Sequence, residues 1–485
     1  MKLSTRPPIV LAEAEMEQIW RAALRVWADV PLRAQGTPEF NDALRGFGCE
    51  IRDDRVTFPP QVREKTLERI AQSREAAGPG RPAEVTSDHL DYSASGQALY
   101  VCDIQTDRLR PATEADLADW SRLCDQFFPP MGRAHPTFIP QDVPLGACDV
   151  HAFATIILNS SQPWRVSVYS AQMLPYFIEL QTVCDGGLGA VKRNTVFAAK
   201  CWYNSPFMIT RENIDIGMAA RELLGIPFTV STMPVAGVAT PATLAGALVH
   251  ITAEILGCNV ISLALDDRLI GYCAGPLTFD MRTGIHTQTG PDVQLLRNGC
   301  AQMRAHVFGG PYTTIGGPST AAKIPGAQSM MEKALDTMWA VCGGVRSFGS
   351  LGTLAFADVG SAVQLVLDLE MMSHFEHLLK GIKVDEEHLA EDVIRQVAPS
   401  GAYYLAAEHT ARHCRDELWA SELMDRRVPM AWVEDPVSMV DRARSKASQL
   451  LAQAPNKCPL SRDQKAEVRR IVAAADAQVA GTTRG

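Results

Sequence analysis

Apolar positions recur every three to four residues over several parts of the chain, which is the spacing of amphipathic helices. In the N-terminal third this pattern covers residues 8–30, 60–77 and 113–127, and Thr113 is the expected N-cap of the last of these helices. An apolar run at 98–104 predicts a strand instead. The chain is therefore predicted to begin with a mostly helical region.

The middle of the chain alternates between short β-rich runs and helical runs. We expect strands at residues 163–169, 195–202, 227–233, 259–265, 312–316 and 345–349. Helices are expected between them, including 242–257 and 291–308. Strands that alternate with helices predict a parallel sheet with right-handed crossovers. The number of such units favours a closed (β/α)8 barrel over a doubly wound sheet. No Gly-x-Gly-x-x-Gly follows an early strand, which weakens the dinucleotide-binding alternative.

From about residue 361 the pattern becomes mainly helical. We expect helices at 361–381, 385–397 and 408–424, and a last helix after a loop at 450–464. The predicted fold class is therefore α/β, a (β/α)8 TIM barrel with an N-terminal helical extension and C-terminal helices. The expected domains are the extension at 1–97, the catalytic barrel at 98–430 and a helical tail at 431–485.

Composition narrows the classes of function. The 485 residues carry a formal net charge of −9, so no basic surface is expected to neutralise nucleic-acid phosphates. The N-terminus lacks an apolar signal segment, and no window holds eighteen uninterrupted apolar residues, so no membrane span is expected. The twelve cysteines contain no Cys-x-x-Cys pair, which favours reduced thiols and a cytoplasmic protein.

The loops that follow the predicted strands are rich in aromatic residues, and in a barrel these loops carry the active site. Aromatic faces attract a quaternary ammonium through cation–π interaction, and arginine pairs with a carboxylate. The substrate-binding residues predicted on this basis are Trp202, Tyr203, Phe207, Tyr272, Phe279, Arg282, Arg346, Phe348 and Phe356. The alternative is core packing for each aromatic residue and a structural salt bridge for each arginine. No catalytic residue is assigned.

Two other features point to different chemistry. Lys323 follows a Gly-Gly-Pro turn, where an aldolase-type lysine could form a Schiff base. His409, His413 and Glu417 are four residues apart, so a helix places them on one face, where they could hold zinc. The alternative is that these three side chains pair with neighbouring helices.

Several motifs, in a consistent order, resemble the trimethylamine methyltransferase superfamily. They are "TMPVAGVATPATLAGALVHITAEILG", "FDMRTG", "GGPSTAAKIPGAQSMMEKAL", "AVQLVLDLEMM" and "EHTARHCRDELWASELMDR". Two earlier stretches, "GCEIRDDRVTFPPQVREK" and "YVCDIQTDRLRPATEADL", resemble its N-terminal part. The resemblance runs from about residue 40 to residue 427. Because the 408–427 stretch belongs to a family motif that is not associated with zinc, pairing with neighbours is the favoured interpretation there, and no metal is expected.

The resemblance implies a (β/α)8 barrel that passes a methyl group from a methylated amine to the cobalt of a separate corrinoid protein. Archaeal trimethylamine members use pyrrolysine, whereas this chain contains only standard residues. It therefore resembles the branch associated with glycine betaine and related betaines. A quaternary ammonium already carries a good leaving group, so the protein must mainly exclude water and align the methyl group.

The expected partners are a corrinoid protein and a small quaternary amine. The chain has no Asp-x-His-x-x-Gly signature for a cobalt-ligating histidine, so the corrinoid is expected to be carried by the partner, with no cofactor bound tightly here. A homo-oligomer is expected.

Two departures from the family pattern bear on the substrate, since Ala321 and Gly326 stand where acids are expected. Those acids either contact the substrate cation in relatives or act as helix caps. The competing functions are a lyase or aldolase that uses Lys323, and a non-catalytic betaine-binding barrel.

Overall fold

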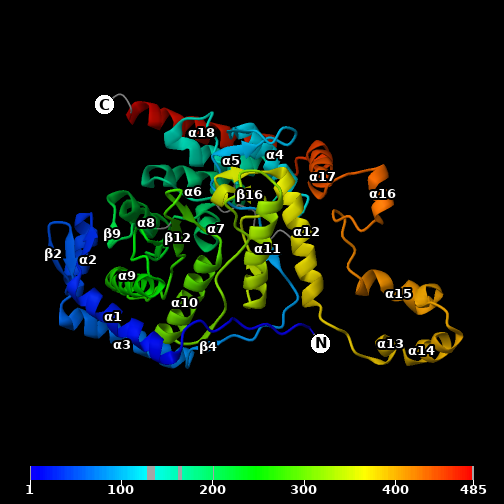
Figure 1. The fold of residues 1–485 in the computed structure, drawn as a ribbon. Helices are drawn as coiled ribbons and strands as arrows, with labels where there is room; N and C mark the ends of the chain where they lie inside the picture. Colours follow the sequence, from blue (N-terminus) through cyan, green and yellow to red (C-terminus); the bar gives the residue numbers. More distant parts are fainter. Residues whose placement is uncertain (1, 128–136, 162–165, 200, 483–485) are drawn as a thin grey trace.

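The computed structural model describes residues 2–127, 137–161, 166–199 and 201–482, and it is α/β, as the sequence predicts (Figure 1). The N-terminal elements are α1 (Glu13–Asp29), β1 (Leu32–Ala34), α2 (Pro38–Phe47), β2 (Glu50–Arg52), β3 (Arg55–Thr57), α3 (Pro60–Ala77), β4 (Arg81–Pro82) and β5 (Asp91–Tyr92). β1 pairs with β3 and, in parallel, with β9 from the middle of the chain. The N-terminal region is thus attached to the body through backbone pairing as well as helix packing.

The middle of the chain alternates short strands with longer helices. In order, its elements are β6 (Tyr100–Cys102), β7 (Leu109–Pro111), α4 (Glu114–Cys124), α5 (Cys148–Asn159), α6 (Leu174–Asp185), α7 (Leu188–Arg193), β8 (Cys201–Tyr203), β9 (Met208–Ile209), α8 (Arg211–Leu224), β10 (Val230–Thr232), β11 (Val235–Ala236), α9 (Leu244–Asp266), β12 (Leu277–Asp280), β13 (Ile285–Thr287), α10 (Pro291–Phe308), β14 (Pro311–Tyr312), α11 (Ala327–Cys342), β15 (Ser347–Phe348), β16 (Thr353–Leu354), β17 (Val359–Gly360) and α12 (Ala362–Leu379).

The strands form several small sheets rather than one continuous sheet. Within the described residues, six separate sheets of two to four strands are present, and no closed barrel is identified among them. Parallel pairing joins β8 with β10, β11 with β12, β14 with β4, β15 with β5 and β17 with β6. Isolated bridges add further parallel contacts, such as Ser167 to Ala198 and Thr232 of β10 to Ala274. The predicted strand at 163–169 lies partly outside the described residues.

Helix boundaries agree with the sequence where local signals mark both ends. α3 and α10 span the predicted 60–77 and 291–308, because each has proline in its first turn and glycine directly after its last turn. Thr113 is the N-cap of α4, as predicted. Its hydroxyl accepts from the backbone N–H of Asp116, whose carboxylate accepts the N–H of Thr113 in return.

The predicted strand at 259–265 is wrong, because these residues form the last two turns of α9. Nearly all of this segment is buried, and periodicity cannot distinguish a fully buried helix from a fully buried strand. α9 is also the one described helix that is long and apolar enough to cross a membrane. Of its most apolar window, 83% is buried inside the protein. α9 is therefore a central core helix, packed against α1, α2 and α10.

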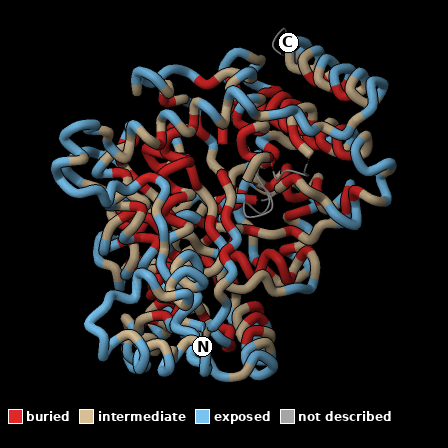
Figure 2. The backbone as a smooth tube through the Cα atoms, turned by 90° about the vertical axis from the view of Figure 1, so that its right-hand side faces the viewer, coloured by how far each residue is buried: buried red, intermediate tan, exposed pale blue. Residues whose placement is uncertain are grey.

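Two large apolar clusters form the core (Figure 2). One cluster surrounds α9 and includes Trp27, Phe40 and Phe228. The other contains residues of α5, α6 and α12 and extends to Val468 and Ile471 near the C-terminus. The last two helices, α17 (Met439–Gln453) and α18 (Arg462–Thr482), therefore return to the body of the protein.

Between α12 and α17 the chain leaves the body as an extended arm (Figure 1). We call residues 380–437 the arm. It contains α13 (Glu386–Leu389), α14 (Glu391–Val397), α15 (Glu408–Glu417) and α16 (Pro429–Glu434). The helix predicted at 408–424 is shorter in the structure, because α15 ends at Glu417. All of these residues are described, and only Leu423 among them is buried.

Candidate functional site

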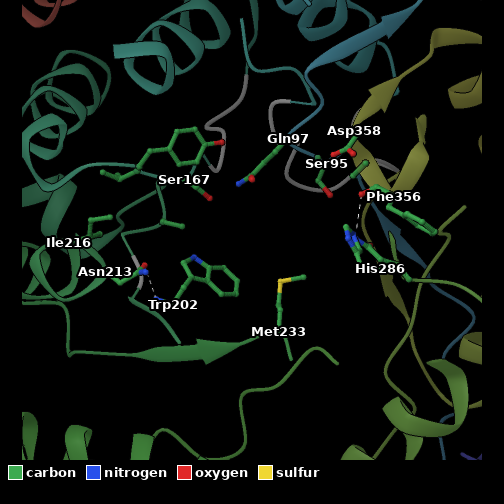
Figure 3. A pocket seen from close by; sticks show the side chains of 16 residues that line it. Ser95, Gln97, Ser167, Trp202, Asn213, Ile216, Met233, His286, Phe356 and Asp358 are labelled. Atoms are coloured by element: carbon green, nitrogen blue, oxygen red, sulfur yellow. Dashed lines mark hydrogen bonds between the residues drawn. The ribbon is translucent and has the colours of Figure 1, made fainter. Parts of the chain in front are cut away.

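Two adjoining cavities lie where several strands end. The first has a volume of about 760 Å³, and we call it the Phe356 cavity (Figure 3). The second has a volume of about 460 Å³, and we call it the Arg297 cavity. Trp202, Met233 and Gln288 line both of them. The two cavities are therefore compartments of one site.

Trp202 is placed by the alternation of β8. Its neighbours Cys201 and Tyr203 are buried on the other face of the strand, whereas Trp202 is 41% exposed. β8 pairs in parallel with β10, and the backbone N–H of Trp202 donates to the side-chain oxygen of Asn213, 3.2 Å away. The indole consequently faces the Phe356 cavity (Figure 3).

Tyr169 adds a second aromatic side chain to the Phe356 cavity, and it is 39% exposed. Its backbone N–H donates to the buried carboxylate of Asp149, 2.8 Å away, which fixes this segment to α5. Burial raises the pKa of Asp149 to about 6. Sequence analysis placed Tyr169 at the end of a predicted strand, so the aromatic residue that precedes a loop was the signal that could have identified it.

The end of the loop from Ser350 to Asp358, at Phe356 and Asp358, forms the wall opposite Trp202 (Figure 3). Four non-glycine residues in it, Ser350, Ala355, Phe356 and Ala357, have φ between 49° and 78°. Each such residue costs about 1–3 kcal/mol and persists only where surrounding contacts impose it. The loop is strained, and it places the Phe356 ring 5.5 Å from the His286 ring.

Backbone hydrogen bonds hold the strained loop against the "GPSTAAK" segment. The N–H groups of Ala355 and Phe356 donate to the carbonyls of Ala322 and Thr320, both at 2.8 Å. Thr320 in turn donates to Glu332 of α11, 2.6 Å away. The wall of the site thus depends on the start of α11.

A buried ion pair lies beneath this loop. Lys333 of α11 and Asp368 of α12 are 2.5 Å apart, and neither side chain is exposed. The Asp368 carboxylate also accepts the N–H of Gly352 at 2.7 Å, and Lys333 donates to the carbonyl of Ser350 at 3.3 Å. Burial lowers the pKa of Lys333 and raises the pKa of Asp368, and each partner's charge opposes that effect. The pair therefore fixes the backbone of the loop to two helices.

Arg297 supplies the positive charge of the second compartment. It projects from α10, and its Nε donates to the carbonyl of Pro276, 3.2 Å away. Within the described part of the chain, the Arg297 guanidinium forms no ion pair. Partial burial lowers the pKa of Arg297, and the charge of the nearby Asp336 opposes this shift. Gly316 and Gly317 line the same compartment. Arg297 is thus a half-buried cation whose remaining N–H donors are available to an anion.

Asp358 supplies a negative charge to the first compartment. It lines the Phe356 cavity and is exposed. Its side chain has no hydrogen bond or ion pair with any other residue in the described ranges. The two compartments therefore carry opposite charges, with Trp202 shared between them.

Among the residues predicted from sequence, Trp202 and Phe356 line the site. The other predicted aromatic residues, all within the described ranges, do not line either cavity: Tyr203, Phe207, Tyr272, Phe279 and Phe348. The hydroxyl of Tyr203 is buried without a hydrogen-bond partner among the described residues, and Phe207 packs 4.6 Å from the His250 ring. The hydroxyl of Tyr272 lies 3.1 Å from the hydroxyl of Thr252, within hydrogen-bonding distance.

The two arginines predicted from sequence also lie away from the cavities. Arg282 is 90% exposed and lies 3.7 Å from Asp280. Arg346 donates to the carbonyls of Ser87, Val341 and Val345 and to the hydroxyl of Thr5. Arg346 therefore binds the N-terminal segment to the body, while a different arginine, Arg297, lines the second cavity.

Lys323 is exposed, and its amino group donates to the carbonyl of Ala321, 2.7 Å away. Lys323 does not line either of the two cavities. The geometry therefore gives no support to a Schiff-base role. Gly326, one of the departures from the family pattern, is the N-cap of α11, with its N–H donating to the hydroxyl of Ser329 at 3.0 Å.

The histidines of α15 contact another helix of the arm. His409 lies 3.1 Å from the carbonyl of Glu387, and His413 lies 3.2 Å from the carboxylate of the same residue. Glu417 lies 3.5 Å from His388. These contacts join α15 to α13, so the side chains pair with neighbours inside the arm rather than across the barrel.

Comparisons with known proteins show the family of this chain. The family model described as trimethylamine methyltransferase (MTTB) matches residues 2–480. The chain is 26% identical over 411 residues to trimethylamine methyltransferase MttB of Methanosarcina thermophila, covering 81% of this chain and 83% of that protein. It is 23% identical over 447 residues to glycine betaine methyltransferase of Desulfitobacterium hafniense strain Y51, covering 91% and 92%. Among solved structures, monomethylamine methyltransferase MtmB of Methanosarcina barkeri matches with a TM-score of 0.42 and 11% identity, covering 97% and 94%.

Proposed function

Because the chain belongs to the trimethylamine methyltransferase family, we propose that this methyltransferase takes its methyl group from a betaine and delivers it to the cobalt of a separate corrinoid protein. A betaine is a quaternary amine that also carries a carboxylate. The observation that carries this proposal is a single site with aromatic faces and an unpaired carboxylate in one compartment and a half-buried guanidinium in the other, all within the described residues. Similarity to a glycine betaine methyltransferase supports the same substrate class.

The Phe356 cavity takes the cationic end of the substrate. Trp202 and Tyr169 offer partly exposed aromatic faces, which attract an ammonium that has no proton to donate. Asp358 adds a negative charge, and no other residue in the described ranges forms an ion pair with its carboxylate. Phe356 and His286 close the opposite wall and help to exclude water.

The Arg297 cavity takes the carboxylate. A guanidinium binds a carboxylate through two parallel hydrogen bonds, and burial strengthens such a pair. Because Trp202 lines both compartments, a zwitterion bound beside it has the cation-binding side chains on one side and Arg297 on the other.

The reaction requires little chemistry from the protein. The bond between nitrogen and the methyl carbon breaks, and the electron pair stays on nitrogen, which leaves as a neutral tertiary amine. The corrinoid, brought by a partner protein, supplies the nucleophilic Co(I) that accepts the methyl group. The residues of the site orient the ammonium, hold the carboxylate and exclude water, so no general acid is needed.

We also propose that the short strands are parts of one distorted (β/α)8 barrel. Parallel contacts link consecutive segments, from Ala98 to Phe138, from Ser167 to Ala198, and from β8 through β10 to Ala274. The domain boundaries at 97/98 and 430/431 stay predictions. The twelve cysteines all lie within the described residues and form no disulfide with one another, which supports placing the enzyme in the cytoplasm.

The Trp202→Ala variant is expected to bind glycine betaine about 30-fold more weakly, since a desolvated cation–π contact is worth about 2 kcal/mol. Isothermal titration calorimetry measures this affinity. Trp202→Phe is expected to retain most of the binding because it keeps an aromatic face. Trp432→Ala removes a tryptophan of similar exposure outside both cavities and is expected to have no effect. Unchanged affinity in Trp202→Ala would contradict the assignment.

A further inference from the structure

A third cavity lies on the body of the protein, between α11 and the start of α10. We call it the α11 groove, and its volume is about 670 Å³. This volume falls in the usual range for small-molecule sites. No residue that lines the α11 groove also lines the Phe356 cavity or the Arg297 cavity. The groove is therefore separate from the proposed betaine site, and it needs a ligand of its own.

One wall of the α11 groove is apolar and open. Met331, Leu335 and Met338 follow one another at intervals of four and three residues, so α11 places them on one face. They are 67%, 57% and 39% exposed. Methionine side chains are flexible and adapt to ligands of different shape. This wall suits the apolar part of a small molecule.

Asp336 places a carboxylate with an unused oxygen in the lining of the same groove. Its side chain belongs to a residue that is only 5% exposed. One oxygen, Oδ1, accepts from the side-chain amide of Gln294 at 2.6 Å. The other oxygen, Oδ2, is buried and has no hydrogen-bond partner among the described residues. Because a buried acceptor without a donor costs about 1–3 kcal/mol or more, the groove is incomplete without a donor at Oδ2.

The charges of the α11 groove favour a cation as the donor. Its described lining residues include two carboxylates, Glu332 and Asp336, and no lysine, arginine or histidine. Glu332 already accepts from the hydroxyl of Thr320 and the N–H of Ala321. Burial raises the pKa of Asp336, and Arg297 opposes this rise through its charge, although the two side chains form no ion pair within the described ranges. A cation with an N–H group would supply both the missing charge and the missing donor.

We propose that the α11 groove binds a small amphiphilic primary amine in its protonated form. The ammonium donates to Oδ2 of Asp336, and the apolar part of the molecule covers Met331, Leu335 and Met338. A primary ammonium fits better than a quaternary one, because only the primary ammonium has N–H groups to donate. A betaine does not fit, because the lining offers no cation to its carboxylate. The proposal therefore adds a second class of ligand and does not depend on the identity of the methyl donor.

Isothermal titration calorimetry of the full chain tests the proposal with two probes of equal length, hexylamine and hexanol. The wild type is expected to bind hexylamine at least about 10-fold more tightly, because only hexylamine brings a charged donor to Asp336. Asp336→Asn keeps the size of the side chain and an acceptor for Gln294. This variant is expected to bind hexylamine about 10-fold more weakly and hexanol as the wild type does. Asp392→Asn, at a carboxylate that is 99% exposed, is the matched control and is expected to change neither affinity.

Methyl NMR of the wild type locates the bound amine, so the test does not depend on the folding of Asp336→Asn. The methionine methyl groups are labelled with ¹³C, and the signals of Met331, Met338 and Met233 are assigned with single Met→Leu variants. Met331 and Met338 line the α11 groove, whereas Met233 lines both compartments of the proposed betaine site. Hexylamine is expected to shift the first two signals and to leave the third unchanged.

A competition experiment separates the α11 groove from the proposed betaine site. Saturating glycine betaine is expected to leave the affinity for hexylamine unchanged. The proposal would be overturned if the wild type bound no hexylamine, if hexanol bound equally well, or if folded Asp336→Asn retained the full affinity. A shift of the Met233 signal alone, or displacement of hexylamine by glycine betaine, would also overturn it.

Discussion

The Asp368→Ala variant is expected to lose about 3–5 kcal/mol of unfolding free energy, because it leaves the Lys333 ammonium buried without its partner. Neither side chain of this pair is exposed in the folded protein. The substitution also removes the acceptor for the N–H of Gly352 and for the side chain of Gln364. Urea denaturation followed by circular dichroism gives the change in free energy.

Two further variants separate the buried charge from other effects. Asp385→Ala removes a carboxylate that pairs on the surface of the arm, and it is expected to change stability little. The double variant Lys333→Met/Asp368→Leu removes both charges and is expected to recover part of the loss, since apolar replacements of buried pairs are often neutral. Wild-type stability of Asp368→Ala would show that the pair does not hold the loop.

The Arg297→Met variant is expected to lower kcat/KM for glycine betaine by about 100-fold or more, because truncating one partner of a buried charge pair costs roughly 2–5 kcal/mol. Methionine keeps the apolar stem that packs along α10. Binding of choline, which has the quaternary ammonium but no carboxylate, is expected to be unchanged. Steady-state demethylation and calorimetry measure the two quantities.

Arg282→Met is the matched control for this prediction. Arg282 lies after β12 and is 90% exposed, so its loss is expected to leave both activity and binding unchanged. An equal loss of affinity for choline and for glycine betaine in Arg297→Met would indicate a damaged cavity rather than a lost carboxylate contact.

Local signals explain which parts of the fold the sequence predicts. α3 and α10 were predicted to the residue because proline starts each helix and glycine follows its end. The last turns of α9 were predicted as a strand because Val260, Ile261 and Leu263 are buried, as in a central strand. The arm was predicted as packed helices because amphipathic periodicity does not reveal what surface, if any, a helix covers.

The proposed site also combines residues that the sequence predicts with residues that it does not. Trp202 and Phe356 line the proposed site, and they could be predicted because strand ends and their loops can be read from the sequence. Tyr203 was included although period-two alternation in β8 turns it to the opposite face. Arg297, which the proposed site uses, was not predicted because it lies within a helix and reaches its cavity only through the packing of α10. The contacts of Arg346 with Thr5 and Ser87 could not be predicted because these residues are far away along the chain.

The central claim is that this protein moves a methyl group from a betaine to a corrinoid protein. The most direct measurement mixes the purified chain with glycine betaine labelled with ¹³C in its methyl groups and a corrinoid protein reduced to Co(I). The account predicts one dimethylglycine formed for each labelled methyl group that appears on the corrinoid. Consumption of trimethylamine with no reaction of any betaine, or no methyl transfer at all, would contradict it.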